Sequence, residues 1–392
     1  MADVHTIEGH GGHPDLGTGV TGGRETTGRG LRVLLLSRYD RIGSSSRLRH
    51  YQFLPLLESH GIHVDVQPLL PNQYLSQLYF EGRKTIQVIA RAYIERLRQF
   101  FQAGRYDLLW IEKEALPWLP YMFERWMLAA GPPYVIDFDD AWFHAYGQHR
   151  QPLVRLLLGD KLNKLMRNAA LVTTGNAYLL SHALRAGAPR VALIPTVVDL
   201  DRYDTSTPAP ARDGFTVGWI GSPVTARYLT SVQDTLRRCL KETPMRVVLV
   251  GADANALESL PVERVNWNEE TEVESIKTFD VGIMPLDNTP WERGKCGYKL
   301  IQYMACERPV IASPVGVNRD IVDHGVNGFL CETPEEWYQA LSALRADPDL
   351  RRAMGKAGRD KVERLYTLDK VGPQLVQLLK TAARVQATPA NA

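Results

Sequence analysis

The sequence predicts an α/β protein made of two doubly wound parallel sheets, each in its own domain. Short apolar runs that suit buried parallel strands alternate with segments of helical spacing from Leu31 onwards. A polar, Pro-rich stretch at 201–214 interrupts this alternation, which then restarts. The chain has 392 residues, so two domains with separate cores are the natural expectation.

The first half opens with a strand, a polar loop and a helix, the beginning of a βαβ unit. We expect strands at 31–37, 62–69, 106–111, 134–138, 170–174 and 191–195. Apolar residues recur at helical spacing in the segments 47–60 and 81–102, and a further helix is expected to open at Gly175. Alternation of this kind predicts a parallel sheet with helices on both faces.

The second half repeats the pattern with a shorter set of strands, at 215–221, 245–251, 281–286 and 309–313. Helices are expected at 225–242, 299–306, 335–346, 348–366 and 369–383. The resulting domains are a disordered Gly/Thr-rich tail (1–30), an N-terminal Rossmann-like domain (31–200), a linker (201–214), a C-terminal Rossmann-like domain (215–368) and a closing helix and tail (369–392) that can cross back. Such a pair predicts an active site in the cleft between the domains, at the carboxyl ends of the strands.

Composition excludes several classes of function. The formal net charge is +2 without any block of like charge, so nucleic acid is not expected as a partner. The four cysteines have no CxxC spacing, which argues against a zinc site or a disulfide framework and favours a reducing cytoplasm. No apolar run reaches the length of a membrane span. The nearest, 116–130, is interpreted as a packed surface helix, and peripheral membrane contact is the alternative.

The strongest chemical signal lies in the loop that follows the strand at 281–286. Arg293, Lys295 and Lys299 are interleaved with Gly294 and Gly297 at a strand-to-helix junction. Free backbone N–H groups, the helix dipole and the cations all favour a phosphate there. A charged, solvated loop is the less favoured interpretation.

Two more junctions in the second half have similar features. Gly221 and Ser222 end one strand, and Arg227 follows five residues after Ser222, which suits a phosphate site or a tight turn with a Ser cap. Trp267 is placed where a nucleotide base can stack, although a lone Trp more often packs in the core.

In the first half, two polar clusters follow strands. The loop with Gly43, Ser44, Ser45 and Arg47 lacks a dinucleotide fingerprint and is either an acceptor or diphosphate contact or a capping cluster. At the end of the strand at 134–138, carboxylates and an imidazole can orient a hydroxyl or act as a base, and the alternative is helix caps: Asp139, Asp140 and His144. No second acidic cluster supports a metal site.

The second half resembles retaining glycosyltransferase family 4, a group of GT-B nucleotide-sugar transferases. The matching text is DVGIMPL, GKCGYKLIQYMACERPVIASPVGVNRDIVDHGVNGFL and RRAMGKAGRDKVERLYTL, about a hundred residues in all. The resemblance implies a GT-B fold, with two Rossmann-like domains facing each other across a cleft. It also implies that Cys296, Gly297 and Tyr298 lie against the donor phosphates and that Gln302 lies near the ribose.

This sequence also departs from the family pattern at several positions. The family has an E-x7-E pair around this loop, whereas Gly294 and Gln302 stand at the two positions here. Its Arg-x4-Lys pair corresponds to Ser222 and Arg227. We therefore expect Lys295 and Lys299 to supply cationic charge, with Glu292 as a substitute carboxylate.

These observations predict a cytoplasmic retaining glycosyltransferase. It would transfer a sugar from a nucleoside-diphosphate sugar to a hydroxyl acceptor, without a cofactor or a metal. The residues expected to take part in the chemistry are Lys295, Lys299, Arg227, Asp139, Asp140 and His144. A catalytically silent nucleotide-sugar-binding subunit, a GT-B sugar-nucleotide epimerase and an NAD-dependent oxidoreductase are the alternatives, in that order.

Overall fold

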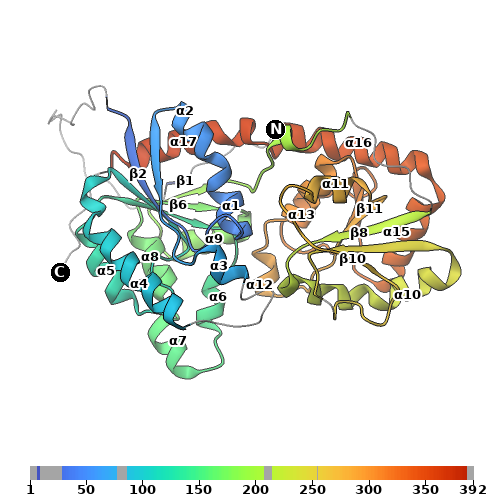
Figure 1. The fold of residues 1–392 in the computed structure, drawn as a ribbon, viewed down its shortest axis with the longest axis horizontal. Coiled ribbons are helices and arrows are strands. Elements are labelled where there is room, and N and C mark those ends of the chain that lie inside the picture. Colours follow the sequence, from blue (N-terminus) through green and yellow to red (C-terminus); the bar gives the residue numbers. More distant parts are fainter. Residues whose placement is uncertain (1–6, 9–28, 77–85, 207–213, 254, 386–392) are drawn as a thin grey trace. The chain divides into compact units, whose positions relative to one another are not determined.

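A computed structural model describes residues 7–8, 29–76, 86–206, 214–253 and 255–385 (Figure 1). The chain forms two compact units. The first contains Met1–Ile194 and Gly372–Ala392, and the second contains Pro195–Val371. Helix α17 (Leu368–Ala382) begins in the second unit and belongs to the first from Gly372, which packs against Leu56.

Among the described residues, the first unit has six parallel strands in the order β3-β2-β4-β5-β6-β7. Their bounds are β2 (Leu31–Leu36), β3 (Ile62–Val66), β4 (Leu108–Glu112), β5 (Tyr134–Phe138), β6 (Leu171–Thr174) and β7 (Arg190–Leu193). All residues of β4 and β5 are buried, as expected for apolar strands covered on both faces. The strand order reverses between β2 and β4, which is the topological switch point of this sheet.

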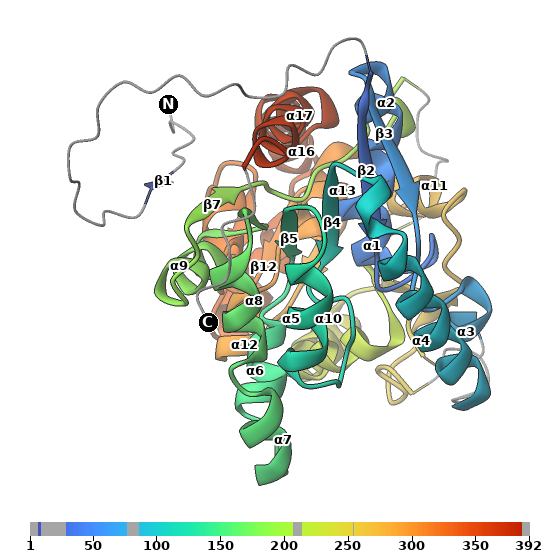
Figure 2. The same ribbon diagram turned by 90° about the vertical axis from the view of Figure 1, so that its left-hand side faces the viewer.

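Helices flank this sheet, and Figure 2 shows several of them from another side. They are α1 (Ser44–Arg49), α2 (Leu54–Ser59), α3 (Asn72–Ser76), α4 (Ile86–Phe101), α5 (Tyr121–Ala129), α6 (Trp142–Gly147), α7 (Pro152–Leu158), α8 (Lys161–Asn168) and α9 (Ala177–Arg185). The single helix expected at 47–60 is wrong, because it is broken near His50 and a 3-10 turn at Tyr51–Phe53 precedes α2. Pro55 lies in the first turn of α2, where its missing N–H costs nothing.

The second unit has six described strands, all parallel, in the order β10-β9-β8-β11-β12-β13. Their bounds are β8 (Phe215–Ile220), β9 (Met245–Val250), β10 (Glu263–Val265), β11 (Val281–Met284), β12 (Val310–Ala312) and β13 (Gly328–Leu330). This is the strand order of a Rossmann fold, with the switch point between β8 and β11. The expected α/β class with doubly wound parallel sheets is confirmed in both units.

Helices of the second unit are α10 (Gln233–Glu242), α11 (Glu272–Lys277), α12 (Pro290–Arg293), α13 (Tyr298–Ala305), α14 (Asn318–Ile321), α15 (Pro334–Ala346) and α16 (Pro348–Leu365). The expected helix at 225–242 begins instead as a 3-10 helix, Pro223–Val232. Most of α13 is buried, including Leu300, Ile301 and Tyr303, so its position is fixed by the core. Rigid support of this kind matters because the cationic loop leads directly into α13.

Three expected segments differ from the structure or lie outside it. The linker expectation is wrong at 201–206, because Leu200–Arg202 forms a 3-10 turn and Tyr203 is buried in the core of the second unit. Within the expected tail, Ile7–Glu8 (β1) pairs antiparallel with β7. The remainder of 1–28, the helix start at 77–85 and the linker segment 207–213 lie outside the described residues.

Candidate functional site

The switch point of the second unit brings a glycine and a lysine into contact. Gly221 directly follows β8, and a Cβ built on it would lie 2.7 Å from Cε of Lys299 and 2.7 Å from the ring of Trp219. Lys299 Nζ lies 5.5 Å from the centroid of that ring. The absence of a side chain at Gly221 therefore allows the lysine to cross the carboxyl end of the strand. This packing makes two of the predicted site residues, Gly221 and Lys299, neighbours.

On the other side of the switch point, a short helix after β11 holds a buried carboxylate. Oε1 of Glu292 accepts hydrogen bonds from Tyr228 Oη at 2.6 Å and Arg227 Nη2 at 3.3 Å, and Oε2 accepts one from Thr289. Burial acts to raise the pKa of Glu292, but the two hydroxyl donors and Arg227 outweigh it and hold that pKa below its usual value. Glu292 is therefore an anion that anchors Arg227 beside α12.

Glycines shape the entrance of α13. Gly297 has φ = 67° at the N-cap of the helix, and a Cβ there would lie 2.3 Å from Cδ1 of Ile321. Gly316 has φ = 54° and lies against the backbone of Arg293. Positive φ and close packing both require glycine at these positions. The backbone N–H of Leu300 donates to the carbonyl of Gly297 at 2.9 Å, and the dipole at the start of α13 favours an anion.

The side chains around this entrance are half-buried. Lys295 Nζ lies 5.5 Å from the ring centroid of Trp291, and Cys296 and Tyr298 are neither fully buried nor exposed. Ser222, also half-buried, follows Gly221. The structure thus places Lys295 and Lys299 on either side of Gly297 at the start of α13, as the sequence predicts.

Two predicted donor contacts have other partners in the structure. Gln302 is 4% exposed and donates from Nε2 to Tyr203 Oη at 3.0 Å. Trp267 is half-buried and donates from Nε1 to Glu272 Oε2 at 3.0 Å. Both side chains line the core of the second unit, so their roles towards the ribose and the base stay predictions.

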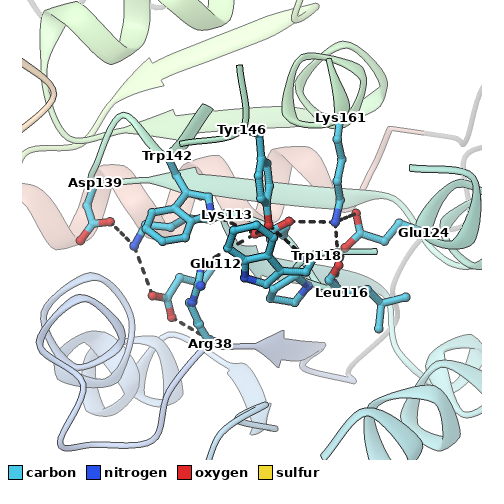
Figure 3. Close-up of polar contacts among 12 residues, drawn as sticks. Arg38, Glu112, Lys113, Leu116, Trp118, Glu124, Asp139, Trp142, Tyr146 and Lys161 are labelled. Atoms are coloured by element: carbon cyan, nitrogen blue, oxygen red, sulfur yellow. Dashed lines mark hydrogen bonds and ion pairs between the residues drawn. The ribbon is translucent and has the colours of Figure 1, made fainter. Parts of the chain in front are cut away.

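At the switch point of the first unit, charged residues form a buried network (Figure 3). It begins at the end of β4, where Glu112 of the strand and the next two residues, Lys113 and Glu114, are all less than 5% exposed. Glu112 Oε2 accepts from Ser46 Oγ at 2.6 Å and from the backbone N–H of Arg38 at 2.9 Å. The carboxyl end of β4 is thereby tied to the end of β2 and to α1.

Glu114 is the centre of the second half of this network. It accepts hydrogen bonds from Tyr146 Oη at 2.8 Å and Trp142 Nε1 at 3.1 Å, and it pairs with Lys161 Nζ at 2.8 Å (Figure 3). Lys161 also lies 3.5 Å from Glu124 and donates to the carbonyl of Leu116 at 2.6 Å. These bonds fix the loop between β4 and α5.

Lys113 combines strain with a strong ion pair. Its φ is 61°, which is uncommon for a residue with a side chain, and Nζ lies 2.6 Å from Asp139 Oδ1. Burial acts to raise the pKa of Asp139, but Lys113 outweighs it and the pKa lies well below its usual value. A hydrogen bond with Ser45 acts in the same direction. Backbone strain at a switch point is typical of a functional site.

The remaining predicted residues of the first unit fall into two groups. Asp139 and Ser45 join the network, and Gly43, which packs on Tyr39, and Ser44 lead into α1 beside buried Arg47. His144 instead bonds Tyr178 Oη at 2.8 Å and lies on α6 among aromatic rings of α9. The side-chain hydrogen bonds of His144 thus run to Tyr178 and Gln148 and not towards the carboxylates that follow β5, so the predicted cluster is only partly brought together.

Sequence reasoning missed the buried residues that follow β4 and their partners. A signal was present in YDLLWIEKEALPWLP, where three consecutive charges follow an apolar strand. The distant partners Arg38, Lys161 and Glu124 carried no such signal.

Among the described residues, no group of three His, Cys, Asp or Glu side chains is placed to hold a metal ion. No helix in this part of the chain has the length and apolarity needed to cross a membrane.

Two family models match the chain, one in each half. A model described as "Glycosyl transferase 4-like domain" matches residues 23–196, and one described as "Glycosyl transferases group 1" matches residues 214–347. The chain belongs to the GT4 family of glycosyltransferases. Members of this family are retaining enzymes that use nucleotide sugars, and the expected family is thereby confirmed. That this GT4 chain lacks the acidic pair of the family stays a prediction.

Curated relatives align with parts of this GT4 chain. The alpha-1,3/1,6-mannosyltransferase ALG2 of Homo sapiens is 38% identical over 74 residues, which cover 19% of this chain and 17% of the relative. D-inositol 3-phosphate glycosyltransferase of Xylanimonas cellulosilytica is 27% identical over 236 residues, 51% of this chain and 53% of the relative. The chain thus spans at most about half the length of these relatives.

Solved structures show the same fold over most of the chain. Sucrose-phosphate synthase from Thermosynechococcus elongatus has a TM-score of 0.65 at 18% identity, covering 90% of this chain and 99% of that one. HepE from Anabaena in complex with UDP-glucose has a TM-score of 0.64 at 18% identity, covering 90% and 100%. The GT4 chain therefore has the GT-B fold, as expected.

Proposed function

We propose that this GT4 protein transfers a sugar from a nucleoside-diphosphate sugar to a hydroxyl acceptor with retention of configuration. The observation that carries the proposal is the placement of Lys295 and Lys299 at the start of α13, beside the β8 strand end. Loss of the donor's diphosphate builds negative charge, and preorganised cations and N–H groups stabilise that charge. HepE binds UDP-glucose, which supports a UDP- or GDP-sugar as the donor class.

In this proposal the donor diphosphate contacts the second unit. The N–H groups at Cys296, Gly297 and Tyr298 and the two lysines bind its oxygens, with Arg293 nearby. Arg227 Nη2 lies 3.3 Å from Glu292 Oε1. This ion pair orients the guanidinium before the donor binds, so its positive charge is already in place. Gly221 and Ser222 offer the backbone of the strand end.

The hydroxyl acceptor contacts the first unit, at the carboxyl end of its sheet. Asp139 remains ionised because Lys113 lies 2.6 Å away, so it can accept a hydrogen bond from an acceptor hydroxyl. Ser45 of α1 hydrogen-bonds Asp139, Arg47 lies buried on the same helix, and Asp140 follows Asp139. Buried partners hold these groups in place, which orients the attacking oxygen.

Substitution of the two lysines tests the proposal. Lys295→Ala and Lys299→Ala should each lower kcat by roughly 100-fold or more, the effect of removing one charge-stabilising donor. Lys356→Ala is the matched control, because Lys356 is exposed on α16 of the same unit. Turnover is measured with UDP- and GDP-sugars, and unfolding temperature checks the fold. Near wild-type rates for both lysine variants would show that the phosphate role is wrong.

A catalytically silent nucleotide-sugar-binding subunit is the second candidate. The observation that favours it is Gln302, which stands where the family pattern has a glutamate and hydrogen-bonds Tyr203. The two functions differ in one measurement. Slow hydrolysis of the bound donor, or any sugar transfer, excludes the silent subunit, whereas donor binding without either reaction supports it. Nucleotide binding is followed by the rise in unfolding temperature that a ligand causes by mass action.

A further inference from the structure

Exposed apolar side chains are distributed unevenly over this protein. Among the described residues, fourteen large hydrophobic side chains are exposed, and eleven of them lie on the first unit. Four are on α4, four are on α5 and the loop before it, and three are on α7: Ile86, Ile94, Leu97 and Phe101; Trp118, Met122, Phe123 and Trp126; Leu153, Leu156 and Leu157. Scattered single residues need no explanation, but concentration on three elements does.

Helix α5 turns its apolar residues outwards. Met122 and Trp126 lie four residues apart on α5, so they share one side of the helix, and they are 68% and 71% exposed. The buried positions of this helix are Glu124 and Leu128. A surface helix of a soluble protein normally buries its apolar stripe. Here a carboxylate faces the interior, where it meets Lys161, and the aromatic side faces out.

Two contacts link the three elements, one between α4 and the loop before α5 and one between that loop and the segment before α7. Tyr93 on α4 donates a hydrogen bond to the carbonyl of Pro117, next to Trp118. The Trp118 ring lies 5.8 Å from the ring of His149, just before α7. Figure 2 shows α4, α5 and α7 on the side of the first unit that faces the viewer. We call these eleven residues and the helices that carry them the α4–α5–α7 surface.

The charges on these helices are mainly positive. The exposed charged residues of α4, α5 and α7 are Arg91, Arg98, Arg125 and Arg155, against the single carboxylate Glu95. Glu95 itself lies 3.5 Å from Arg98. Arginine and tryptophan beside exposed leucine and phenylalanine are the composition of helices that lie in a lipid interface.

We propose that the α4–α5–α7 surface docks on a membrane that contains anionic lipid. The apolar side chains enter the boundary between headgroups and acyl chains, and the two tryptophans lie at headgroup depth. The four arginines contact lipid phosphates, which adds an electrostatic attraction that salt weakens. The surface is separate from the donor-binding cations of the second unit. The proposal therefore stands independently of the glycosyltransferase reaction.

Binding to vesicles tests the proposal without donor or acceptor. Vesicles of phosphatidylcholine alone are compared with vesicles that also contain about three parts in ten of phosphatidylglycerol, a level that gives a negative surface potential. We expect the wild-type protein to sediment with the anionic vesicles at least ten times more strongly than with the neutral ones. Raising the salt concentration should reduce that binding.

Matched variants assign the binding to this surface. Met122→Ser with Trp126→Ser should lower the partition coefficient about tenfold or more, and Arg91→Gln with Arg125→Gln should abolish the preference for anionic vesicles. The control is Val224→Ser with Val326→Ser, which removes exposed apolar side chains of the second unit and should bind as wild type does. Unfolding temperatures verify that each variant is folded.

Two outcomes would overturn the proposal. One is a wild-type protein that stays in the supernatant with both kinds of vesicle, or a Met122/Trp126 variant that binds as strongly as wild type. The other is a dimer in solution that the same two substitutions dissociate, which would assign the surface to a second copy of the chain. Neither outcome would affect the proposed transfer reaction, because turnover is measured with soluble substrates and the Lys295 and Lys299 variants.

Discussion

Replacing Lys161 by methionine removes one charge from the buried network of the first unit while keeping the length of the side chain. Lys161 Nζ lies 2.8 Å from Glu114 and 3.5 Å from Glu124, and all three side chains have no exposed area. It also donates to the carbonyl of Leu116 at 2.6 Å. The variant therefore removes the cation that two carboxylates and a carbonyl oxygen share, and Glu114 keeps only the more distant Arg38 at 3.7 Å.

The expected cost is large because the carboxylates cannot reach water. Removal of one partner from a buried ion pair costs about 3–5 kcal/mol. For a domain of 150–250 residues each kcal/mol lowers the unfolding temperature by roughly 2–4 °C, so a fall of about 6–20 °C is expected for the first unit. The second unit should unfold at its former temperature, since no residue of this network belongs to it.

The loss of stability caused by Lys161→Met should also depend on pH. Burial raises the pKa of Glu124 from 4.5 to about 7, although Lys161 opposes the shift. Between these two values the folded state holds a proton that the unfolded state releases, so stability falls as pH rises. Without Lys161 the pKa of Glu124 rises further. The variant should therefore be closer to wild type at pH 6 than at pH 8.

Calorimetry of wild type, Lys161→Met and Lys164→Met at both pH values provides the measurement. Lys164 lies on the same helix, is 45% exposed and pairs with Asp160 at 3.6 Å, so its substitution should change stability by less than about 1 kcal/mol. A Lys161→Met protein that melts within about 2 °C of wild type would refute the reasoning, given the scale above. If the loss of stability in Lys161→Met were larger at pH 6 than at pH 8, its pH dependence could not come from Glu124.

Three further predictions concern other contacts. Gly221→Ala places a methyl group 2.7 Å from Cε of Lys299 and 2.7 Å from the buried ring of Trp219, so kcat should fall about tenfold or more and the unfolding temperature should fall as well, measured by turnover and calorimetry. Glu292→Gln weakens the anchor of Arg227, so KM for the donor should rise several-fold in steady-state kinetics. Burial lowers the pKa of His182 to about 4, so stability should be lost as pH falls from 6.5 to 4, and unfolding of His182→Gln should show less of that loss.

The architecture was predictable because buried parallel strands leave a continuous apolar run. The runs at 108–111, 134–138 and 215–220 are such strands, and each was expected within two residues of its observed bounds. β10 and β13 were missed because each has three residues, and β10 is largely exposed, so no apolar run marks them. The helix at 47–60 failed because the break at His50 comes from local backbone geometry, which spacing does not encode.

The position of a site residue in the fold could be predicted where the residues that define it are close together in the sequence. Lys295, Gly297 and Lys299 lie within five residues, and their order alone places cations at a helix start. Sequence reasoning did not foresee the hydrogen bond of Gln302, whose partner Tyr203 is 99 positions away and was assigned to a linker. It failed in the same way for Glu114, which meets Lys161 across 47 positions of sequence. Burial of polar residues by distant partners is set by tertiary packing, so only the structure shows it.

The two switch points differ in how their charges are balanced, and the difference fits their proposed roles. Beside β8 and β11, Arg227, Lys295 and Lys299 stand against the single buried carboxylate Glu292, so the site has more positive than negative charge. A site of that kind lowers the energy of a diphosphate as negative charge develops on it.

Beside β2 and β4, every buried carboxylate of the network has a cation or hydrogen-bond donor within the unit. Asp139, for example, has Lys113 at 2.6 Å. Such a balanced set has no excess of charge for an anion, but its carboxylates can accept hydrogen bonds from neutral hydroxyls. Because the partners are buried and the loop after β4 is strained at Lys113, these acceptors cannot relax towards a bound molecule. In the proposed reaction the first unit would therefore orient a neutral hydroxyl, and the second would stabilise the negative charge that develops on the leaving diphosphate.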